Sequence, residues 1–567
     1  MDMKRAFDLE MQRLAESGQA FAHANPEQAR MLNLDEVHDR DPYVERLLEG
    51  VAYLTAGVRH EIDASLSDFH DQLLACTAPE LVEPFPSTTV LQFRARDGEP
   101  GAVTLLAGAR VLSQPAGDTR VRVPFVTLFD TVVRPLRAAS TTWVDAGEGR
   151  SELRLTLRAD GAEALPPLDA LDLFIDAEPA LAHALRHGLT AQVSAVEARV
   201  GHDTGWHRLG GGGAIAPWYP APRAERVEGT IPGSPALERL QHFFMARETL
   251  HCIRLYGLET LHRDHDCARM EVRVLLNATP PTPVEGRDGL IRCNCVPAVN
   301  LVRGGSDPLR LGHRATECLV KASADGVGAR VVHQVLAAVG RSMDRRVVAP
   351  FVPLWEWDFA PEKQRLFRVK RRDNGTGTPV LSVVLEDDGA AGLETVSTDI
   401  LYSHGAIPRL HLSKGDVDQP AAELPDGIGV TSLRRPTPYR SPPARDAAFQ
   451  ALTALARTDL ERLATGPAIR ALLASLDRTE GTDARARIEA VREVTCSATG
   501  RLRRGVLEQG LEIRVAVDGR RLLNAGEAAL LGELLHSLFQ EWAPVDRYVT
   551  TRVAVEPGGE ETLWTTQ

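Results

Sequence analysis

Cysteine and aromatic residues are scarce in this sequence of 567 residues. Seven cysteines in so long a chain are too few for a disulfide framework, and their scatter favours a reducing compartment. Aromatic residues make up 5% of the chain, so no stacking platform for nucleic-acid bases dominates it. No run of about 18 apolar residues occurs, so we expect no membrane-spanning helix.

Basic residues are also fewer than acidic ones. There are 65 Lys+Arg against 77 Asp+Glu, which gives a formal net charge of -12. Neutralising phosphates requires a basic face, so the overall charge does not favour nucleic acid as a partner. The opening residues, MDMKRAFDLE, carry acidic side chains where a secretory signal would have an apolar core. We therefore expect a soluble, cytoplasmic protein with no direct membrane insertion.

The composition is otherwise that of an ordinary globular protein. Hydrophobic residues make up 43% and charged residues 25%, which excludes wholesale disorder. The length predicts about three to five domains. Helical and strand patterns both occur, so the predicted fold class is α+β and multidomain: long N-terminal helices, then mixed and mostly antiparallel β domains. The expected divisions are a helical element at 1–80, a β-rich domain at 81–225, a middle α+β domain at 226–430 and a C-terminal α+β domain at 431–567.

The N-terminal region predicts two helices. Phe7, Met11 and Leu14 recur at helical spacing before Asn25-Pro26, and a longer helix begins after Asp41-Pro42. Its apolar residues follow one another in steps of three and four, a near-heptad stripe sustained over many turns. The stripe predicts a buried seam that faces either its own domain or a partner. Its candidate partner-binding residues are Leu47, Val51, Leu54, Val58 and Ile62.

Period-two patterns and turn residues predict most of the strands. The clearest candidates after Pro84-Phe85-Pro86 are 88–93, 103–106, 121–127, 152–157 and 171–175, and later ones are 380–386, 398–402 and 511–517. Further helices are expected from Pro235, at 447–457, at 469–476 and at 527–539. The last of these carries an unusually broad apolar surface for one domain face, which includes Leu534, Leu538 and Phe539.

One group of residues suggests a metal site. His251, Cys252, His262, His265, Cys267, Cys293 and Cys295 are all ligand types that zinc accepts. Neither 265/267 nor 293/295 has the spacing of a zinc knuckle, and the region reads as strands. Buried cysteines and exposed histidines are the commoner explanation. A zinc-dependent hydrolase built around the His251–Cys295 group remains the alternative to a protein without a cofactor.

Other catalytic motifs are incomplete. His60-Glu61 begins like H-E-x-x-H, but position 64 is Ala. The glycine run at 210–213 lacks the Lys-Ser/Thr of a P-loop, and no G-x-S-x-G occurs. Arg501 to Arg504 include three arginines, a small basic patch that indicates a solvated helix end or turn, or a contact with an acidic partner. No complete catalytic motif is found, so we predict that the protein is not an enzyme.

Several phrases occur together, in order, along the chain. They are FAHANPEQARML, DPYVERLLEGVAYLTAGVRHEID and LVEPFPSTTVLQF near the start, then CVPAVNLV, ILYSHGAIPRLHLSKGD and, near the end, GLEIRVAVDGRRLLNAGEAALLGELLHSLFQEW. In this order they resemble the TssF family, a baseplate wedge component of bacterial type VI secretion systems.

The resemblance implies a structural subunit rather than an enzyme. It implies a wedge made with a TssG-like protein and a second copy of the chain, and a ring of wedges around a VgrG-like spike. It also implies contact with a TssE-like sheath initiator and, through the partner, with a TssK-like adaptor. The location would be a cytoplasmic baseplate docked at the inner membrane. The C-terminal part, from Pro436, would be a dimerisation-type domain, with Leu534, Leu538 and Phe539 in a contact between copies.

Overall fold

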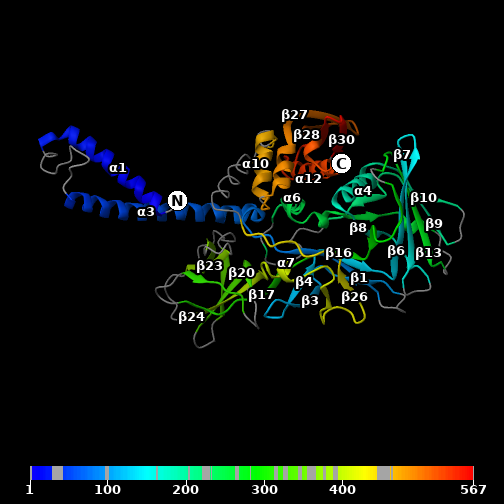
Figure 1. The fold of residues 1–567 in the computed structure, drawn as a ribbon, viewed down its shortest axis with the longest axis horizontal. Coiled ribbons are helices and arrows are strands. Elements are labelled where there is room, and N and C mark those ends of the chain that lie inside the picture. Colours follow the sequence, from blue (N-terminus) through cyan, green and yellow to red (C-terminus); the bar gives the residue numbers. More distant parts are fainter. Residues whose placement is uncertain are drawn as a thin grey trace. The chain divides into compact units, whose positions relative to one another are not determined.

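The computed structural model describes most of the chain. The described residues are 3–27, 42–95, 101–160, 164–201, 205–219, 230, 233–261, 267–280, 283–311, 317–323, 330–342, 348–353, 365–373, 379–386, 394–442, 460, 464–479 and 481–565. Contacts between residues divide the chain into two units, Met1–Leu73 and Leu74–Gln567 (Figure 1).

The first unit is a pair of helices. Helix α1 (Met3–Ala24) lies beside α3 (Pro42–Thr77), whose last residues belong to the second unit. Pro42 suits the first turn of a helix, because its missing N–H would have no intrahelical partner. At 36 residues, α3 is about three times the length of an average helix. Its predicted start after Asp41 is confirmed.

The second unit begins with a six-stranded antiparallel sheet. A 3₁₀ helix, η1 (Pro79–Leu81), leads into it. Leu91 of the first strand pairs with Val296, and Phe93 and Phe125 are buried in its core. In order across the sheet, the strands are β25 (Val417–Pro420), β3 (Arg110–Ala116), β4 (Val121–Thr127), β16 (Cys295–Val299), β1 (Thr88–Arg94) and β26 (Gly429–Ser432).

Two further antiparallel sheets share a core with helix α4 (Pro179–Ala191), which contributes Leu185 and Leu189. The larger has the order β10 (His207–Gly210), β9 (Val193–Val200), β13 (Arg269–Leu276), β7 (Arg150–Ala159), β6 (Leu136–Gly147) and β14 (Val284–Arg287). The smaller has the order β11 (Ile215–Pro217), β12 (Cys252–Leu255), β8 (Leu171–Ile175) and β15 (Ile291–Cys293).

A separate sheet of eight described strands surrounds Phe351, Phe367 and Ile400. Its order is β17 (Val302–Gly305), β24 (Glu394–Ser403), β20 (Val331–Ser342), β21 (Val348–Pro353), β22 (Leu366–Asp373), β23 (Pro379–Glu386) and β19 (Glu317–Leu319), with β18 (Leu309–Leu311) also on β24. The smaller described elements are the ribbon of β2 (Val103–Leu105) and β5 (Thr131–Val133), helix α7 (Ile407–His411) and the 3₁₀ helices η2 (Arg247–Leu250), η3 (Leu258–Thr260) and η5 (Gly519–Arg521).

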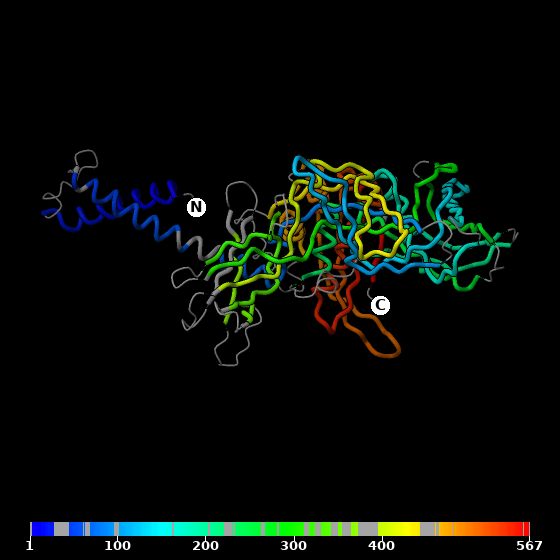
Figure 2. The backbone as a smooth tube through the Cα atoms, turned by 90° about the horizontal axis from the view of Figure 1, so that it is seen from below, coloured from blue at the N-terminus to red at the C-terminus, as the bar shows by residue number. Residues whose placement is uncertain are grey.

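The chain ends in a mixed sheet covered by helices. The strands are β27 (Val491–Arg503), β28 (Val506–Asp518), β29 (Tyr548–Glu556) and β30 (Glu560–Thr565), in that order. Strands β28 and β29 are parallel, and parallel neighbours need a crossover, which α12 (Ala525–Glu541) supplies. Helices α6 (Pro235–Met245), α10 (Gly466–Leu476) and α11 (Thr482–Ala490) join the same core. Figure 2 shows the β27–β28 hairpin, in orange, extending away from its neighbours.

The predicted fold class is confirmed: helices at the N-terminus, then several antiparallel sheets, then a mixed sheet with helices. The strand predicted at 171–175 coincides with β8. The expected division at 225/226 would cut three sheets, because β1 pairs with β16, β7 with β13, and β8 with β12. The helix predicted at 447–457 lies outside the described residues.

Candidate interaction surface

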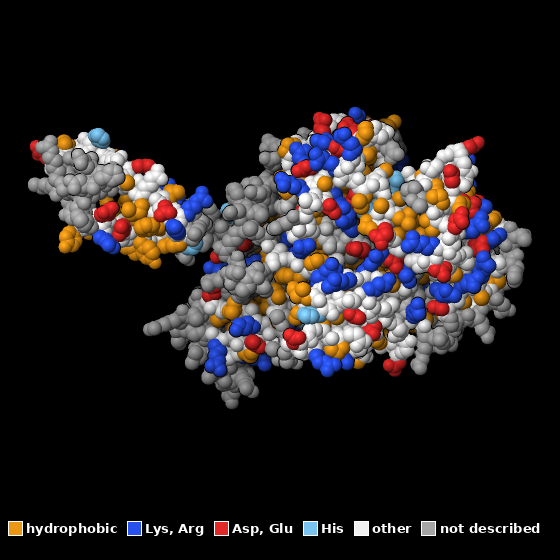
Figure 3. Space-filling model, viewed as in Figure 1, with side chains coloured by type: hydrophobic (Ala, Val, Ile, Leu, Met, Phe, Trp, Pro, Cys, Tyr) orange, Lys and Arg blue, Asp and Glu red, His pale blue; other side chains and the backbone are white. Residues whose placement is uncertain are grey.

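The apolar stripe of α3 is exposed. The side chains of Leu47, Leu54, Val58 and Ile62 are 62–69% exposed, and that of Val51 is 38% exposed. We call these five residues the α3 stripe. Figure 3 shows hydrophobic side chains gathered along one side of the helical unit. Contiguous apolar surface left in water marks contact sites in soluble proteins. The seam predicted from the sequence therefore does not face the core of its own unit.

Small residues occupy another face of α3. Ala52 and Ala56 are fully buried, and the Nη1 of Arg59 lies 2.9 Å from the Oε1 of Glu10 on α1. Residues 52 and 56 are one helical turn apart, and they fall on the side of the helix away from the stripe. Because small side chains let two helices approach closely, α1 packs on this face and leaves the large aliphatic residues uncovered.

The predicted residues of α12 lie elsewhere. Leu534, Leu538 and Phe539 are fully buried in the core of the second unit, where α12 packs against α4, α6 and β29. The expectation that they form a surface between copies is not supported, because no part of these side chains reaches water. The apolar surface that looked too broad for one domain face is covered by helices from distant parts of the chain.

A buried ion pair fixes α12 to α4. The Nη1 and Nη2 of Arg186 lie 2.8 and 3.1 Å from the two carboxylate oxygens of Glu533, and the Tyr219 hydroxyl donates to Glu533 at 2.6 Å. Burial alone would raise the pKa of the Glu533 carboxyl, but Arg186 and Tyr219 hold it below its ordinary value. Both groups are therefore charged, and their separation would leave two unpaired charges in the protein interior.

A second buried carboxylate lies at the start of α12. Glu527 is fully buried and accepts hydrogen bonds from the Nε of Arg487 at 2.6 Å, the Nη1 of Arg247 at 3.1 Å and the backbone N–H of Leu523 at 2.7 Å. Burial alone would raise the pKa of this carboxyl, but the Arg487 and Leu523 hydrogen bonds hold it below its ordinary value. These bonds join α12 to α11 and η2, so the C-terminal sheet is firmly attached within the second unit.

Four of the five described members of the histidine and cysteine group, His251, Cys252, Cys293 and Cys295, are buried, and Cys267 is half-buried. The rings of His251 and His183 meet edge to face with centroids 5.1 Å apart, and burial lowers the pKa of both. Burial raises the pKa of the Cys293 thiol to about 12 and that of Cys295 well above its ordinary value. Zinc binds thiolate, so these neutral thiols are poor ligands. His262 and His265 lie outside the described residues. Among the residues that the structure describes, no three His, Cys, Asp or Glu side chains lie close enough together to hold a metal ion.

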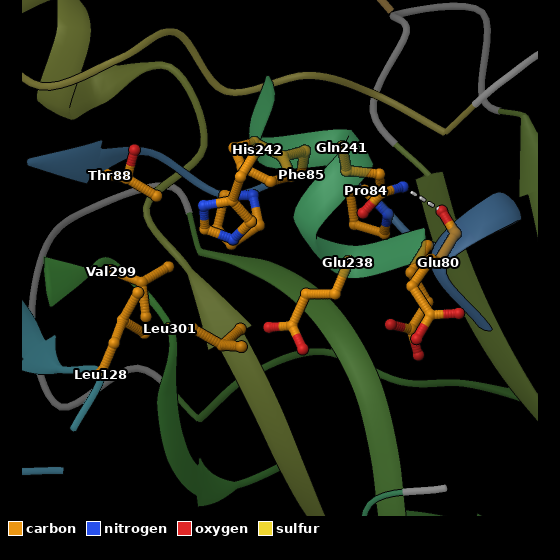
Figure 4. A pocket seen from close by; sticks show the side chains of 12 residues that line it. Glu80, Pro84, Phe85, Thr88, Leu128, Glu238, Gln241, His242, Val299 and Leu301 are labelled. Atoms are coloured by element: carbon orange, nitrogen blue, oxygen red, sulfur yellow. Dashed lines mark hydrogen bonds between the residues drawn. The ribbon is translucent and has the colours of Figure 1, made fainter. Parts of the chain in front are cut away.

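A small pocket lies beside α6 and η1. Glu80 and Glu238 line it on one side, opposite Leu128 and Val299 (Figure 4), and Glu83 also contributes to its lining. The volume open to water is about 60 Å³, whereas sites for small molecules usually occupy several hundred. The side-chain amide of Gln241 donates to the Glu80 carbonyl across the edge of the pocket. The pocket therefore has room for a few water molecules and not for a substrate.

The basic patch lies at the turn of the β27–β28 hairpin, so the prediction of a turn is confirmed. Arg504 and Gly505 both have positive φ, as a two-residue hairpin turn requires. Sequence reasoning missed that Leu502 and Leu507, a cross-strand pair beside this turn, are 75% and 70% exposed. The Arg-Gly dipeptide could have indicated the hairpin turn. The strand before it, β27, is too polar to show the apolar alternation by which strands are predicted.

Among the described residues, no helix combines the length and apolar character needed to cross a bilayer.

The family model described as "Type VI secretion system, TssF" matches residues 1–567. The type VI secretion system component TssF1 of Pseudomonas aeruginosa is 24% identical over 612 residues, which covers 98% of this chain and 97% of TssF1.

Two solved structures are also similar. A chain of the TssK-TssF-TssG baseplate subcomplex of the type VI secretion system, determined by cryo-electron microscopy, is 24% identical with a TM-score of 0.76. The match covers 92% of this chain and 98% of that one. A chain of a baseplate complex from the type VI secretion system is 23% identical with a TM-score of 0.62, and the match covers 99% and 98% of the two chains. These likenesses show that the fold is shared.

Proposed function

Because this chain belongs to the TssF family of the type VI secretion system, we propose that it is a structural wedge subunit of a type VI secretion baseplate. Its role is to hold other subunits in place around the spike and to start the assembly of sheath and tube. The family match over the whole chain supports this role, and the buried, neutral histidines and cysteines give no support to the alternative of a zinc-dependent hydrolase.

The α3 stripe is the observation that carries the proposal. Five large aliphatic side chains on one face of a 36-residue helix are exposed to water. Burying each of them fully would contribute about 1.5–3 kcal/mol. A partner helix with its own apolar stripe is the natural occupant, since residues in steps of three and four pack into the grooves of a facing helix. We assign this position to the TssG-like partner.

The other partners follow from the family and its solved relatives. The similarity to a chain of the TssK-TssF-TssG subcomplex supports a TssG-like and a TssK-like partner. A second copy of this chain, a TssE-like sheath initiator and a VgrG-like spike complete the proposed surroundings. The proposed location is a cytoplasmic baseplate docked at the inner membrane. Residues 431–567, which contain the mixed sheet, are the proposed dimerisation domain.

The proposed mechanism is a change of contacts and involves no chemical step. Switching assemblies commonly move rigid bodies against one another at interfaces that have two stable packings. The buried pairs of Arg186 with Glu533 and of Arg487 with Glu527 favour a C-terminal sheet that moves together with α4 and α11. Changes between the baseplate states are then expected at the partner contacts.

Introducing charge into the stripe tests the proposal. In a Val51→Asp, Val58→Asp variant, two exposed aliphatic residues become carboxylates, which would be buried without partners in the complex at a cost of several kcal/mol. We expect the variant to keep its circular dichroism spectrum and to lose co-purification with the TssG-like protein. The matched control is Tyr53→Asp, His60→Asp, since these residues are exposed on the same helix outside the stripe. Equal retention of the partner by both variants would contradict the proposal.

A further inference from the structure

Strand β27 forms an unusually open edge of the C-terminal sheet. It is 13 residues long and pairs only with β28 among the described strands. Residues 494–500, VTCSATG, carry neither charge nor proline, which are the usual means of keeping an edge strand from pairing with another chain. The opposite edge, β30, has six residues and begins with Glu560 and Glu561. Of the two edges of this sheet, β27 therefore offers the longer uncharged stretch to another strand.

The fold limits the open part of this edge at both ends. At the start of β27, the Nη1 of Arg470 donates to the carbonyl oxygens of Val491 and Arg492, at 2.7 and 3.0 Å. At the other end, the hairpin turn begins after Arg503. A strand that pairs with β27 must therefore centre on the middle of it, close to Ser497.

The side chains of β27 are self-complementary about this centre. Successive side chains of a strand point to opposite faces, so one face carries Glu493, Thr495, Ser497, Thr499 and Arg501. In an antiparallel pair of two β27 strands centred on Ser497, Glu493 faces Arg501 of the other copy at both ends, and Thr495 faces Thr499. Opposite charges and threonine pairs directly across two strands are both stabilising. Glu493 makes no ion pair with a described residue of its own chain, whereas the Nε of Arg501 lies 2.7 Å from Glu508 and would share its charge between Glu508 and Glu493 of the other copy.

We propose that two copies of this chain pair edge to edge through β27, antiparallel, with Ser497 on the two-fold axis. The two four-stranded sheets become one sheet of eight strands, and the contact is isologous. This inference rests on the proposed function, which supplies the second copy of the chain. It adds the surface through which the two copies are joined.

The exposed apolar tip of the hairpin fits the same arrangement. Leu502 lies on the opposite face of β27 from Ser497 and is 75% exposed, so pairing through β27 would bring its apolar side chain next to the other copy. A contact of one strand is small, so the isolated chains associate weakly. Within a ring, the neighbouring contacts hold the two copies close and raise their effective concentration. Covalent trapping is therefore the appropriate measurement.

The test places one cysteine at the proposed axis. In the full-length chain with Cys496→Ala, Ser497→Cys brings two thiols directly opposite each other, with Cβ atoms about 4.5–5.5 Å apart and within reach of a disulfide. The control, Thr495→Cys, lies on the same strand and face, but its two copies are four residues out of register, about 13 Å apart. We expect mild oxidation to give a disulfide-linked dimer with Ser497→Cys and none with Thr495→Cys. A Ser497→Cys chain that stays monomeric, or equal dimer from both variants, would overturn the proposal.

Charge reversal supplies an independent measurement. In the Ser497→Cys background, Glu493→Arg places two arginines opposite each other twice per dimer, so we expect the rate of cross-linking to fall roughly tenfold. Adding Arg501→Glu restores the opposite charges and should recover much of the rate; an unchanged rate in both would contradict the register. Co-purification with the TssG-like protein is measured in parallel. If cross-linking fails while co-purification persists, this inference alone is wrong.

Discussion

Arg186 on α4 and Glu533 on α12 form a two-point ion pair inside the second unit, although 347 residues separate them in the sequence. The side chain of Arg186 is 3% exposed. Close by, the approach of the two helices leaves no room for a side chain at Gly526, because a Cβ there would lie 2.3 Å from the carbonyl oxygen of His183. This charge pair and this close backbone contact both join α12 to α4, together with the hydrogen bond that the Asn524 side chain donates to the Ala180 carbonyl.

Removal of Arg186 should strongly destabilise the chain. Arg186→Met leaves the Glu533 carboxylate buried without its cation, and breaking a buried pair in this way costs about 3–5 kcal/mol. The measurement is the free energy of unfolding in urea. Arg485→Met is the control, since Arg485 forms an exposed pair with Glu489 and such pairs contribute about 0–1 kcal/mol. Similar losses in the two variants would contradict the assignment.

His183 should make the fold less stable in mild acid. Burial, together with Arg247 and Arg186, lowers the pKa of its ring to about 4, whereas the unfolded chain has a pKa near 6.5. Below pH 6.5 His183 becomes protonated in the unfolded state but stays neutral in the folded state. Protonation therefore favours unfolding, and the stability that the neutral His183 contributes is lost as the pH falls towards 4. Two and a half pKa units correspond to roughly 3 kcal/mol.

His183→Gln removes this titration. We expect the unfolding free energy of the variant to depend less on pH between 6.5 and 4 than that of the wild type, as followed by urea unfolding at several pH values. At pH 8, where the histidine is neutral in both states, the variant reports the packing cost alone. Parallel pH profiles for variant and wild type would exclude His183 as a source of acid sensitivity.

The cysteines should differ in reactivity. Cys252, Cys293 and Cys295 are buried, and burial raises the pKa of each thiol, whereas Cys76, Cys267, Cys318 and Cys496 are half-buried. Since the thiolate is the reactive form, an aromatic disulfide reagent should label some of the second group in the folded chain. The first group should react only after unfolding. Mass spectrometry of labelled peptides identifies the sites, and rapid labelling of Cys293 in the native protein would contradict the burial.

The sequence predicted the positions of helices and strands more successfully than which of their faces are buried. The period of three and four located α3 and α12 equally well, but it could not show that Leu54 is exposed and Leu534 buried. That difference depends on which helices cover each face, and the covering helices come from distant parts of the chain. The β7–β13 and β8–β12 pairs likewise join segments more than 75 residues apart, so a linear division into domains could not predict them.

The candidate site was predicted in part for the same reason. The stripe on α3 needed only its own sequence, because an amphipathic helix carries its pattern within a few turns. The pair of Arg186 with Glu533 and the open edge of β27 have no local signature, since each depends on neighbours that only the fold brings together. Polar strands such as β27 also lack the apolar alternation on which prediction rests.

Hydrogen exchange of the full-length chain, alone and in complex with the TssG-like protein, tests the central claim most directly. Peptides that cover residues 42–62 carry the α3 stripe, and a helix that packs against a partner opens less often. The account predicts slower exchange of these peptides in the complex, with no change in peptides from α12, most of whose residues are buried in the chain alone. Unchanged exchange across residues 42–62 in a complex that stays intact would contradict it.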